Sequence, residues 1–432
     1  MNNISLKGSP LQGLAGATLG FFFGFAAVAL YGPTAQNFQE AMNLTPAMVG
    51  FLVSIPSLSG SLLRIPFGAW VDENGGKKPM MILLFLSLIG LSGVTLLLKT
   101  SYPDNMQGMY WLVLLFGCLS GCGIATFSPG NAMTSYWFPQ RKQGLALAAY
   151  AGIGNLAPGL FSFILPLYLH KFGFISAYIA WSVFLATGFV LFLLVGVNAW
   201  YFQLKSKNTD NTQCISVAKE KGEELFPSGN AKQSLMKSAK VANTWALVLL
   251  YFATFGGFLA LTAWFPTYWM KLHGYEAVTA GVLTGCFSIL ASAIRIPGGS
   301  ISDKIGGERL CLISMYLMLG AALILTFSFN TVFAFIAAIV MAVAMGFNNA
   351  AVFKLVSAYV PTAVGGASGW VGGLGAFGGF VIPPLLGWFV SLYGNVGYGR
   401  GFIVFVVLSV INLFVLYFWL MRYKRKQELQ NK

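Results

Sequence analysis

Long apolar stretches separated by short polar segments run through most of the chain. Twelve of them have about 20 residues or more, the length that an α-helix needs to cross a hydrocarbon layer of ~30 Å. Stretches of this length with few charges are typical of transmembrane helices. We therefore predict twelve spans, at residues 14–34, 47–71, 79–98, 110–137, 144–169, 174–203, 243–270, 277–302, 310–329, 331–359, 366–391 and 399–421.

One long polar segment interrupts this pattern after the sixth span. Residues 204–242 are rich in Lys, Glu, Ser and Asn and poor in large apolar side chains, which predicts a solvated linker. The linker separates a first half, residues 1–203, from a second half, residues 243–432, each with six spans. The predicted fold is therefore all-α and integral to a membrane.

The distribution of Lys and Arg predicts the orientation, because cytoplasmic loops carry an excess of these residues. With a cytoplasmic N-terminus, 19 of the 26 basic residues lie on the inner side, 4 on the outer side and 3 within spans. We therefore expect both termini in the cytoplasm and a location in the inner (cytoplasmic) membrane. The net charge of +14 then reflects orientation and contact with anionic lipid headgroups, and no nucleic-acid partner is expected.

A single motif occurs once in each half. It reads LLRIPFGAWVDENGGKK at residues 62–78 and AIRIPGGSISDKIGGER at residues 293–309. One offset places Arg64 on Arg295, Gly68 on Gly299 and Asp72 on Asp303. A duplicated half-protein is the simplest cause, so the two six-helix halves should be related by a pseudo-two-fold axis.

Arg64 and Arg295 are the main candidates for a binding site. An arginine at the centre of a span costs roughly 2.5 to 3.5 kcal/mol and stays charged. All 12 Asp and Glu residues fall outside the predicted spans, so backbone carbonyls, water or a mobile anion must offset the two charges. This favours a transporter that binds an anion where the halves meet, although each arginine could instead extend to the cytoplasmic face.

Lys354 is a third basic residue within a predicted span. It precedes Pro361 by seven residues, so its long side chain could reach the cytoplasmic face or point into the protein. If it points inward, a bound anion would raise its pKa and the arginines would lower it. Anion binding and proton binding would then favour each other.

Small residues recur every fourth position in spans 5 and 11, so other helices can approach these faces closely. The repeated G-x-x-x-D-x-x-G-G string fits a short cytoplasmic turn whose aspartate meets a helix N-terminus or a basic residue when the inner side closes. Both features predict moving parts rather than binding groups. The conformational gating residues predicted on these grounds are Gly68, Asp72, Gly299, Asp303, Gly369, Gly373 and Gly375.

Other classes of function find little support in the sequence. The five cysteines have no metal-ligand spacing, so neither a metal nor a cofactor is expected. The two histidines fall in predicted loops with no catalytic cluster around them, which argues against an enzyme. Two alternatives stay open: a transporter of organic anions or phosphate, which also suit paired arginines, and a sensor that binds an anion without moving it.

Taken together, these motifs resemble a known family. The twelve spans, the long central loop and the two G-x-x-x-D-x-x-G-G turns are similar to the major facilitator superfamily. The strings AGIGN in span 5 and GGASGWVGGLGAFGGFVIPP in span 11, with the arginines of spans 2 and 8, resemble its nitrate/nitrite porters. The resemblance covers nearly the whole chain.

This resemblance implies a nitrate site at mid-membrane and alternating access to it. Arg64 and Arg295 would clamp the anion, Asn155 and Tyr251 would donate hydrogen bonds near it, and Phe127 and Phe353 would lie on its two faces. One small inorganic anion, nitrate or nitrite, is the implied substrate. A monomer is expected.

The residues leave two modes of transport open. Importing an anion against an inside-negative potential costs about 2.3 kcal/mol per 100 mV, so a driving ion is required. Exchange of nitrate for nitrite cancels the charge and needs no titrating group. Proton symport needs one, and Lys354 is the only inward candidate, so symport is slightly favoured and Lys354 joins the predicted substrate-binding residues.

Overall fold

The computed structural model describes residues 6–207, 209–227, 231–360 and 363–422. This part of the chain contains twelve helical spans long and apolar enough to cross a membrane, which confirms the predicted all-α membrane fold. The spans are Pro10–Met42, Pro46–Asn74, Lys77–Ser101, Tyr110–Trp137, Ala149–Phe172, Phe174–Val195, Ala242–His273, Ala277–Ile305, Gly307–Phe327, Thr331–Val356, Gly366–Arg400 and Ile403–Leu420.

Several spans consist of two helical segments. In the first half the helices are α1 (Pro10–Phe25), α2 (Tyr31–Met42), α3 (Pro46–Leu62), α4 (Arg64–Asn74), α5 (Lys77–Ser101), α6 (Tyr110–Ser120), α7 (Phe127–Trp137), α8 (Gln140–Phe172) and α9 (Phe174–Val195). The starts of α1 and α3 follow a common rule: proline occupies the first helical position, and Ser9 or Thr45 before it accepts a backbone N–H bond.

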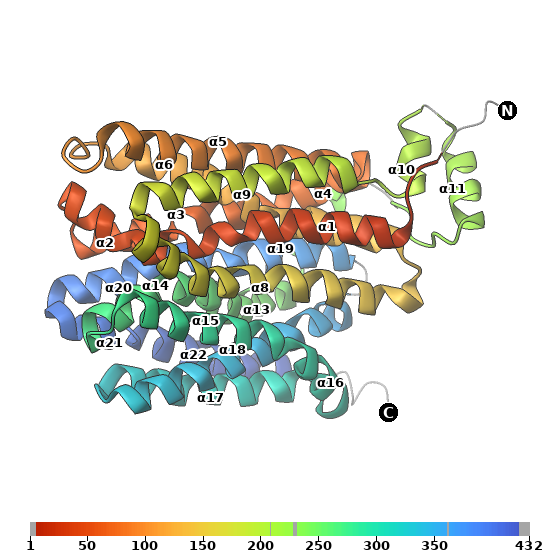
Figure 1. The fold of residues 1–432 in the computed structure, drawn as a ribbon. Helices are drawn as coiled ribbons and strands as arrows, with labels where there is room; N and C mark the ends of the chain where they lie inside the picture. Colours follow the sequence, from red (N-terminus) through yellow and green to blue (C-terminus); the bar gives the residue numbers. More distant parts are fainter. Residues whose placement is uncertain (1–5, 208, 228–230, 361–362, 423–432) are drawn as a thin grey trace.

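The second half repeats this arrangement below the first in Figure 1. Its helices are α13 (Ala242–Tyr251), α14 (Gly257–His273), α15 (Ala277–Ala293), α16 (Arg295–Ile305), α17 (Gly307–Phe327), α18 (Thr331–Tyr359), α19 (Val364–Ala376), α20 (Gly378–Tyr393), α21 (Gly397–Arg400) and α22 (Ile403–Val415). A wide π turn, residues 252–256, joins α13 to α14.

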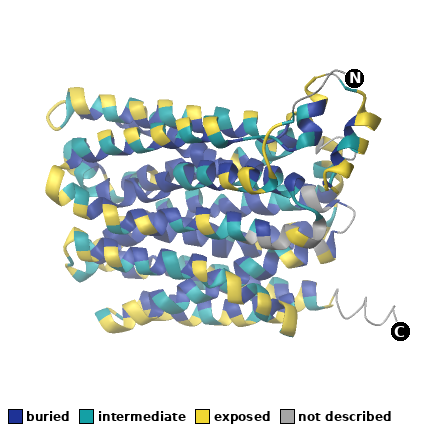
Figure 2. Ribbon diagram, turned by 45° about the vertical axis from the view of Figure 1, so that its right-hand side comes forward, coloured by how far each residue is buried: buried dark blue, intermediate teal, exposed yellow. Residues whose placement is uncertain are grey.

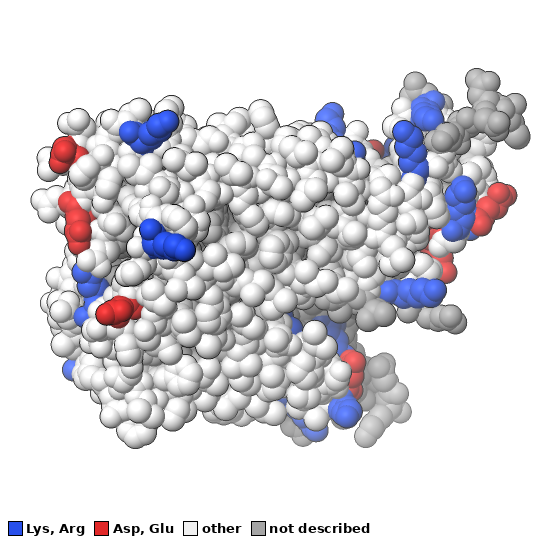
Figure 3. Space-filling view, in the orientation of Figure 1, with Lys and Arg blue, Asp and Glu red and all other residues white. Residues whose placement is uncertain are grey.

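The outside of the bundle is apolar, as a lipid-facing surface requires. Buried residues concentrate where the helices of the two halves meet, and exposed ones lie along the periphery (Figure 2). Large apolar side chains such as Trp111 and Leu194 are about three-quarters exposed, at 76% and 74%. On the face shown in Figure 3, charged side chains gather at the two ends and leave an uncharged band between them.

The two halves touch closely at the end of the bundle that lies opposite α10 and α11, here called the far end. A Cβ at Gly32 would lie 2.3 Å from the carbonyl oxygen of Ala263, and one at Gly50 would lie 2.6 Å from that of Pro383. Neither position has room for a side chain, because backbone of the other half occupies the space. The far end is therefore closed by direct packing of α2 on α14 and α3 on α20.

The linker is more ordered than its composition suggests. Span 6 ends at Val195, so residues 200–203, which were predicted to belong to it, instead form most of α10 (Trp200–Lys205). The linker itself contains α11 (Asn211–Glu220) and α12 (Ala231–Ala239). Helices α10 and α11 project from one end of the bundle, here called the linker end (Figure 1). α12 packs on the other half, where Trp370 Nε1 donates to the carbonyl of Leu235 over 2.9 Å. The linker thus contacts both halves at the linker end.

Helices α10 and α11 have an apolar cluster of their own. Its partners belong to distant segments, which is why the local composition did not reveal it: the rings of Tyr136 and Phe202 lie 4.8 Å apart, and those of Trp137 and Trp200 lie 5.0 Å apart. Val71, at the end of span 2, joins the same cluster. We call α10, α11 and residues 221–226 the cap.

Glu223 anchors the cap. Its carboxylate is 1% exposed and accepts the backbone N–H bonds of Trp200, over 2.6 Å, and Tyr201, over 3.1 Å, at the start of α10. Burial raises the pKa of Glu223 to about 7, although these two bonds act to lower it. The side chain therefore changes charge near neutral pH.

This pKa predicts a pH-dependent cap. Folding raises the pKa of Glu223 from its ordinary value of 4.5 to about 7. Glu223 therefore stabilises the folded cap fully below pH 4.5, and this contribution is lost as the pH rises through about 7. Amide exchange in α10 and α11, corrected for intrinsic rates, should be faster at pH 7.5 than at pH 5.5. Glu223→Gln keeps an acceptor but cannot titrate, so it should abolish the difference. Equal pH dependence in both proteins would contradict this prediction.

Candidate functional site

A break in each repeat helix places the two arginines. Helix α3 ends at Leu62 and α15 ends at Ala293, each four residues before the proline of the R-I-P string. A proline ring clashes with the carbonyl of residue i−4 and has no N–H to donate, which favours a helix break at this point. Arg64 and Arg295 then begin α4 and α16 in equivalent positions.

Arg64 is fully buried at the contact between the halves. Its Nε donates to the carbonyl of Gly60 over 3.1 Å, its Nη1 to that of Gly372 over 3.4 Å, and its Nη2 to that of Ile124 over 3.5 Å. Gly372 belongs to α19 of the second half. The guanidinium group is thus held by backbone oxygens of three spans, which offset its charge only in part.

Arg295 is half-buried and approaches the same place from the second half. Its Nη2 donates to the hydroxyl of Tyr251 over 3.1 Å. The guanidinium carbons of Arg64 and Arg295 each lie 5.1 Å from the centre of the Phe255 ring. The separation of these two carbons therefore cannot exceed twice that distance, and the two permanent cations share one aromatic neighbour.

Aromatic rings surround the two guanidinium groups. Phe127 lies 4.9 Å from the guanidinium carbon of Arg64. Tyr251 stacks on Phe255 at 4.9 Å with 13° between the planes, and Phe353 meets Tyr251 edge-on at 5.1 Å. The structure therefore gathers Arg64, Arg295, Phe127, Tyr251 and Phe353 around Phe255. We call these six residues the arginine cluster.

Phe255 was missed by the sequence reasoning. It is one of 38 phenylalanines and belongs to no repeated motif. Its position four residues after Tyr251 was the available signal, because side chains at i and i+4 lie on the same helix face.

No fixed anion neutralises the arginine cluster. Within the described part of the chain, neither guanidinium group has a carboxylate within 4.0 Å. Two like charges on one ring repel each other, and a low-polarity surrounding strengthens that repulsion. A small anion between them would remove it, and the donors and rings present match a flat anion with oxygen atoms at its edge.

Comparison with known proteins identifies the family. The sequence pattern of the Major Facilitator Superfamily matches residues 17–360 and 279–432. The chain belongs to the major facilitator superfamily. The resemblance inferred from its motifs is confirmed, and like the other members it is a transporter rather than an enzyme.

The relatives of this facilitator include proteins named for nitrate. It is 28% identical to a probable nitrate/nitrite antiporter, NarK1, of Thermus thermophilus, over 85% of this chain and 83% of that protein. It is also 28% identical to a probable nitrate transporter, NarT, of Staphylococcus epidermidis, over 92% and 94%. A probable nitrate/nitrite transporter, NarK2, of Mycobacterium tuberculosis is 28% identical over 84% and 85%.

Solved structures agree on the fold. The xylose transporter XylE from E. coli, in a partially occluded inward-open conformation, superposes with a TM-score of 0.72, covering 95% of this chain and 99% of that one at 14% identity. A crystal structure of a D-xylose-proton symporter gives the same TM-score at 14% identity, covering 94% and 97%. At this identity the likeness concerns the fold alone.

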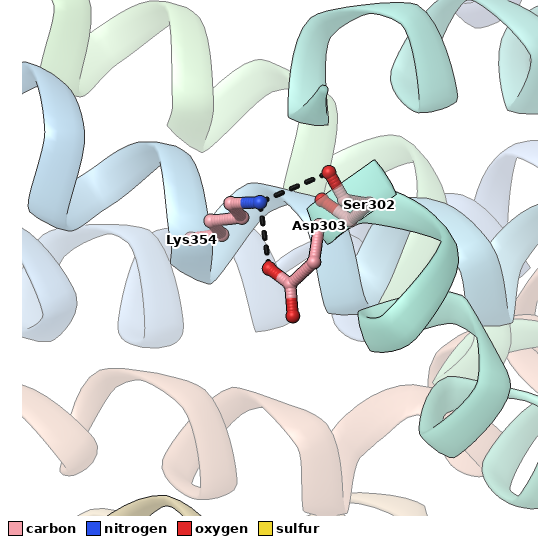
Figure 4. A network of polar contacts seen from close by, with 3 residues as sticks. All are labelled: Ser302, Asp303 and Lys354. Atoms are coloured by element: carbon pink, nitrogen blue, oxygen red, sulfur yellow. Dashed lines mark hydrogen bonds and ion pairs between the residues drawn. The ribbon is translucent and has the colours of Figure 1, made fainter. Parts of the chain in front are cut away.

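Lys354 of the facilitator lies outside the arginine cluster, and its predicted role in substrate binding stays a prediction. Its Nζ forms an ion pair with Asp303 over 2.6 Å and donates to the carbonyl of Ser302 over 2.9 Å (Figure 4). The side chains of Lys354 and Asp303 are 42% and 73% exposed. Successive helix residues point about 100° apart, so Phe353 reaches Tyr251 while Lys354 turns away.

Asn155 is buried near the contact of spans 5 and 8. Its Nδ2 donates to the backbone carbonyl of Ala151 over 2.6 Å, and its backbone carbonyl accepts from Ser292 Oγ over 3.0 Å. Its Oδ1 has no hydrogen-bond partner among the described residues. Ser292 lies three residues before Arg295 in the sequence, and neither of these hydrogen bonds of Asn155 reaches a guanidinium group.

The predicted gating residues occupy different surroundings. In α19, a Cβ at Gly373 would lie 2.6 Å from Ile65 of the first half, and one at Gly375 would lie 2.6 Å from the Tyr251 ring. Gly369 faces Leu235 of the linker helix α12, where the same distance is 3.3 Å. The glycines of α19 thus let it approach α4, the arginine cluster and the linker.

The two repeated strings, predicted as turns, lie mostly within α4 (Arg64–Asn74) and α16 (Arg295–Ile305), and only their last glycines follow the helix ends. Their polar contacts differ. Asp72 accepts a hydrogen bond from the hydroxyl of Tyr136 over 2.7 Å, whereas its counterpart Asp303 has the ion pair with Lys354. Gly68 packs on Ser128, and Gly299 has nothing within 4 Å of an added Cβ. The described residues contain no group of three or more His, Cys, Asp and Glu side chains arranged to hold a metal ion.

Proposed function

We propose that this facilitator carries nitrate and nitrite across the cytoplasmic membrane by alternating access, with the linker end in the cytoplasm. One observation carries the proposal: Arg64 and Arg295, one from each half, converge on Phe255 with no carboxylate partner in the described residues. The names of the sequence relatives support the substrate, and the excess of Lys and Arg at the linker end supports the orientation. Since one chain contributes both arginines, a monomer suffices.

In this proposal the anion bridges the two halves. The planar guanidinium groups donate hydrogen bonds to its oxygens. Tyr251 and Asn155 provide further hydrogen-bond donors nearby, and the rings of Phe127 and Phe353 lie on either side of the anion. Binding lowers the repulsion between Arg64 and Arg295, so the halves close more readily when loaded than when empty. The glycine face of α19 lets the two halves move against each other about the arginine cluster, and the packed far end closes one side of the site.

Exchange of nitrate for nitrite is the mode that the geometry favours. The preference for proton symport rested on an inward Lys354, and Lys354 instead pairs with Asp303. Neither guanidinium group contacts a carboxylate or an imidazole in the described residues. Exchange needs no titrating group, because one anion enters for each that leaves.

Competition for uptake tests the substrate class. In vesicles containing the purified protein, nitrite and chlorate should reduce the uptake of labelled nitrate at concentrations close to the nitrate KM. Phosphate and small carboxylates should not, since in this proposal the rings of Phe127 and Phe353 lie against the two faces of a small flat anion. Equal competition by phosphate would favour the organic-anion or phosphate transporter instead. Saturable binding of nitrate without any uptake would favour a sensor.

The Lys354 ion pair predicts a mild variant. Exposed ion pairs contribute about 0 to 1 kcal/mol, so Lys354→Gln should retain nitrate uptake within roughly fivefold of the original protein. The initial uptake rate in vesicles at matched protein content measures this. A loss of uptake as severe as that expected from replacing Arg64 or Arg295 would contradict this prediction and support a role for Lys354 in substrate binding.

A further inference from the structure

The π turn of span 7 lies at the arginine cluster. It follows Tyr251 directly and contains Phe255, and the backbone N–H of Gly257 donates to the carbonyl of Phe252, five residues before it. Such turns are rare insertions in α-helices and occur frequently at functional sites. The two stacked rings that face the arginines therefore stand at the beginning and near the end of one wide turn.

Three buried polar side chains hold this turn against span 10. Asn348 Nδ2 donates to Thr254 Oγ1 over 2.9 Å and to the carbonyl of Leu250 over 3.3 Å. Thr254 Oγ1 lies 2.8 Å from Asn349 Oδ1 and 2.9 Å from the carbonyl oxygen of Leu250. Its single hydrogen can donate to one of these two acceptors at a time. All three side chains are at most 4% exposed. The network thus ties α18 to the residue before Tyr251 and to the residue before Phe255.

Stability alone does not account for these residues. Asn348 Oδ1 is buried with no partner among the described residues, and an unsatisfied buried acceptor is unfavourable. A leucine or valine would fill the same space without that cost. The amides and the hydroxyl are therefore better explained by the geometry they impose on the turn.

The geometry points to a positioning role: we propose that Thr254, Asn348 and Asn349 hold the wide turn and thereby set Tyr251 and Phe255 against the two arginines. A regular α-helix turns about 100° per residue. A turn closed five residues on rotates the chain by less per residue than this. Loss of the wide turn would therefore change the angle between Phe255 and Tyr251 about the helix axis and tilt the two rings out of their 13° stack. This inference rests on the proposed function only in taking the arginine cluster as the anion site.

Thr254→Val tests the network with little change of shape. Valine keeps the volume but has no hydroxyl, so it removes the bonds to Asn348, Asn349 and Leu250. A 4-fluorophenylalanine at position 255 reports the ring's surroundings by ¹⁹F NMR, whatever the substrate. We expect the resonance to move in Thr254→Val and in Asn348→Leu, and to return to its original position in Thr254→Ser, which keeps the hydroxyl.

Thr284→Val is the matched control. Thr284 is also fully buried, but its recorded hydrogen bond goes to the carbonyl of Ala280 in its own helix. Thr284→Val should lower the thermal stability of the protein about as much as Thr254→Val does, and it should leave the ¹⁹F resonance in place. A resonance that stays unmoved in Thr254→Val, or that moves equally in Thr284→Val, would overturn the positioning role.

Nitrate affinity separates this proposal from the proposed function. Nitrate binding to the purified protein should weaken by about tenfold in Thr254→Val, as expected for lost buried hydrogen bonds, with unchanged affinity in Thr284→Val. If the original protein binds no nitrate, the substrate assignment fails while the ¹⁹F result still decides the role of the network. If it binds nitrate and Thr254→Val binds it equally well, only the positioning role fails.

Discussion

Replacing Arg295 by lysine should lower nitrate uptake by roughly 100-fold, as expected when hydrogen bonds to a charged group are lost. Lysine keeps the charge but lacks the planar fork that can hold two oxygens at once. Arg64→Lys should be at least as severe, since Arg64 is fully buried and donates to three carbonyls that lysine cannot reach together. The measurement is the initial rate in vesicles at nitrate concentrations below the KM.

Arg309→Lys provides the control for both variants. Arg309 is exposed in the first turn of α17, outside the arginine cluster, so its replacement should leave uptake within twofold. If Arg64→Lys and Arg295→Lys behaved like this control, charge alone would suffice, and the shaped pair of donors would have no role.

Nitrite inside the vesicles should by itself drive nitrate uptake, with no proton gradient. A potential of 100 mV opposes the entry of a lone anion by about 2.3 kcal/mol, roughly 50-fold in the equilibrium ratio, and exchange removes this term. The empty site adds a second reason: Arg64 and Arg295 repel each other, so the empty carrier should return slowly. We expect rapid uptake into nitrite-loaded vesicles, little into empty ones, and no effect of a proton uncoupler.

The opposite pattern would establish symport. Acid outside would then drive uptake into vesicles without internal nitrite, and the uncoupler would abolish it. Because Lys354 is paired with Asp303, we would then expect the coupled proton to bind at a group other than Lys354.

The sequence predicted the broad architecture because that depends on strong, repeated signals. The twelve spans follow from apolar length, and the equivalence of Arg64 and Arg295 follows from one motif that occurs in each half. The helix break before each arginine was not predicted, although the proline of the same motif accounts for it in both copies. The binding roles of Asn155, Tyr251, Phe127 and Phe353 stay predictions.

The features that the sequence did not reveal depend on partners from distant segments. From its place in α18, Lys354 could reach either the cytoplasmic face or the protein interior. Its ion pair with Asp303 of α16 determines its position in the structure. The aromatic residues 200–202 were predicted to end span 6 because they are apolar, yet they leave the bundle and pack on Tyr136 and Trp137 of span 4. Phe255 is distinguished by its contacts with Arg64 and Arg295, which come from distant segments of the chain.

A structure determined with saturating nitrate would test the central claim most directly. The account predicts one nitrate between the halves, with oxygens about 3 Å from guanidinium nitrogens of both Arg64 and Arg295, and with Phe127 and Phe353 against its faces. Nitrate bound away from these arginines, or guanidinium groups turned toward lipid, would contradict it.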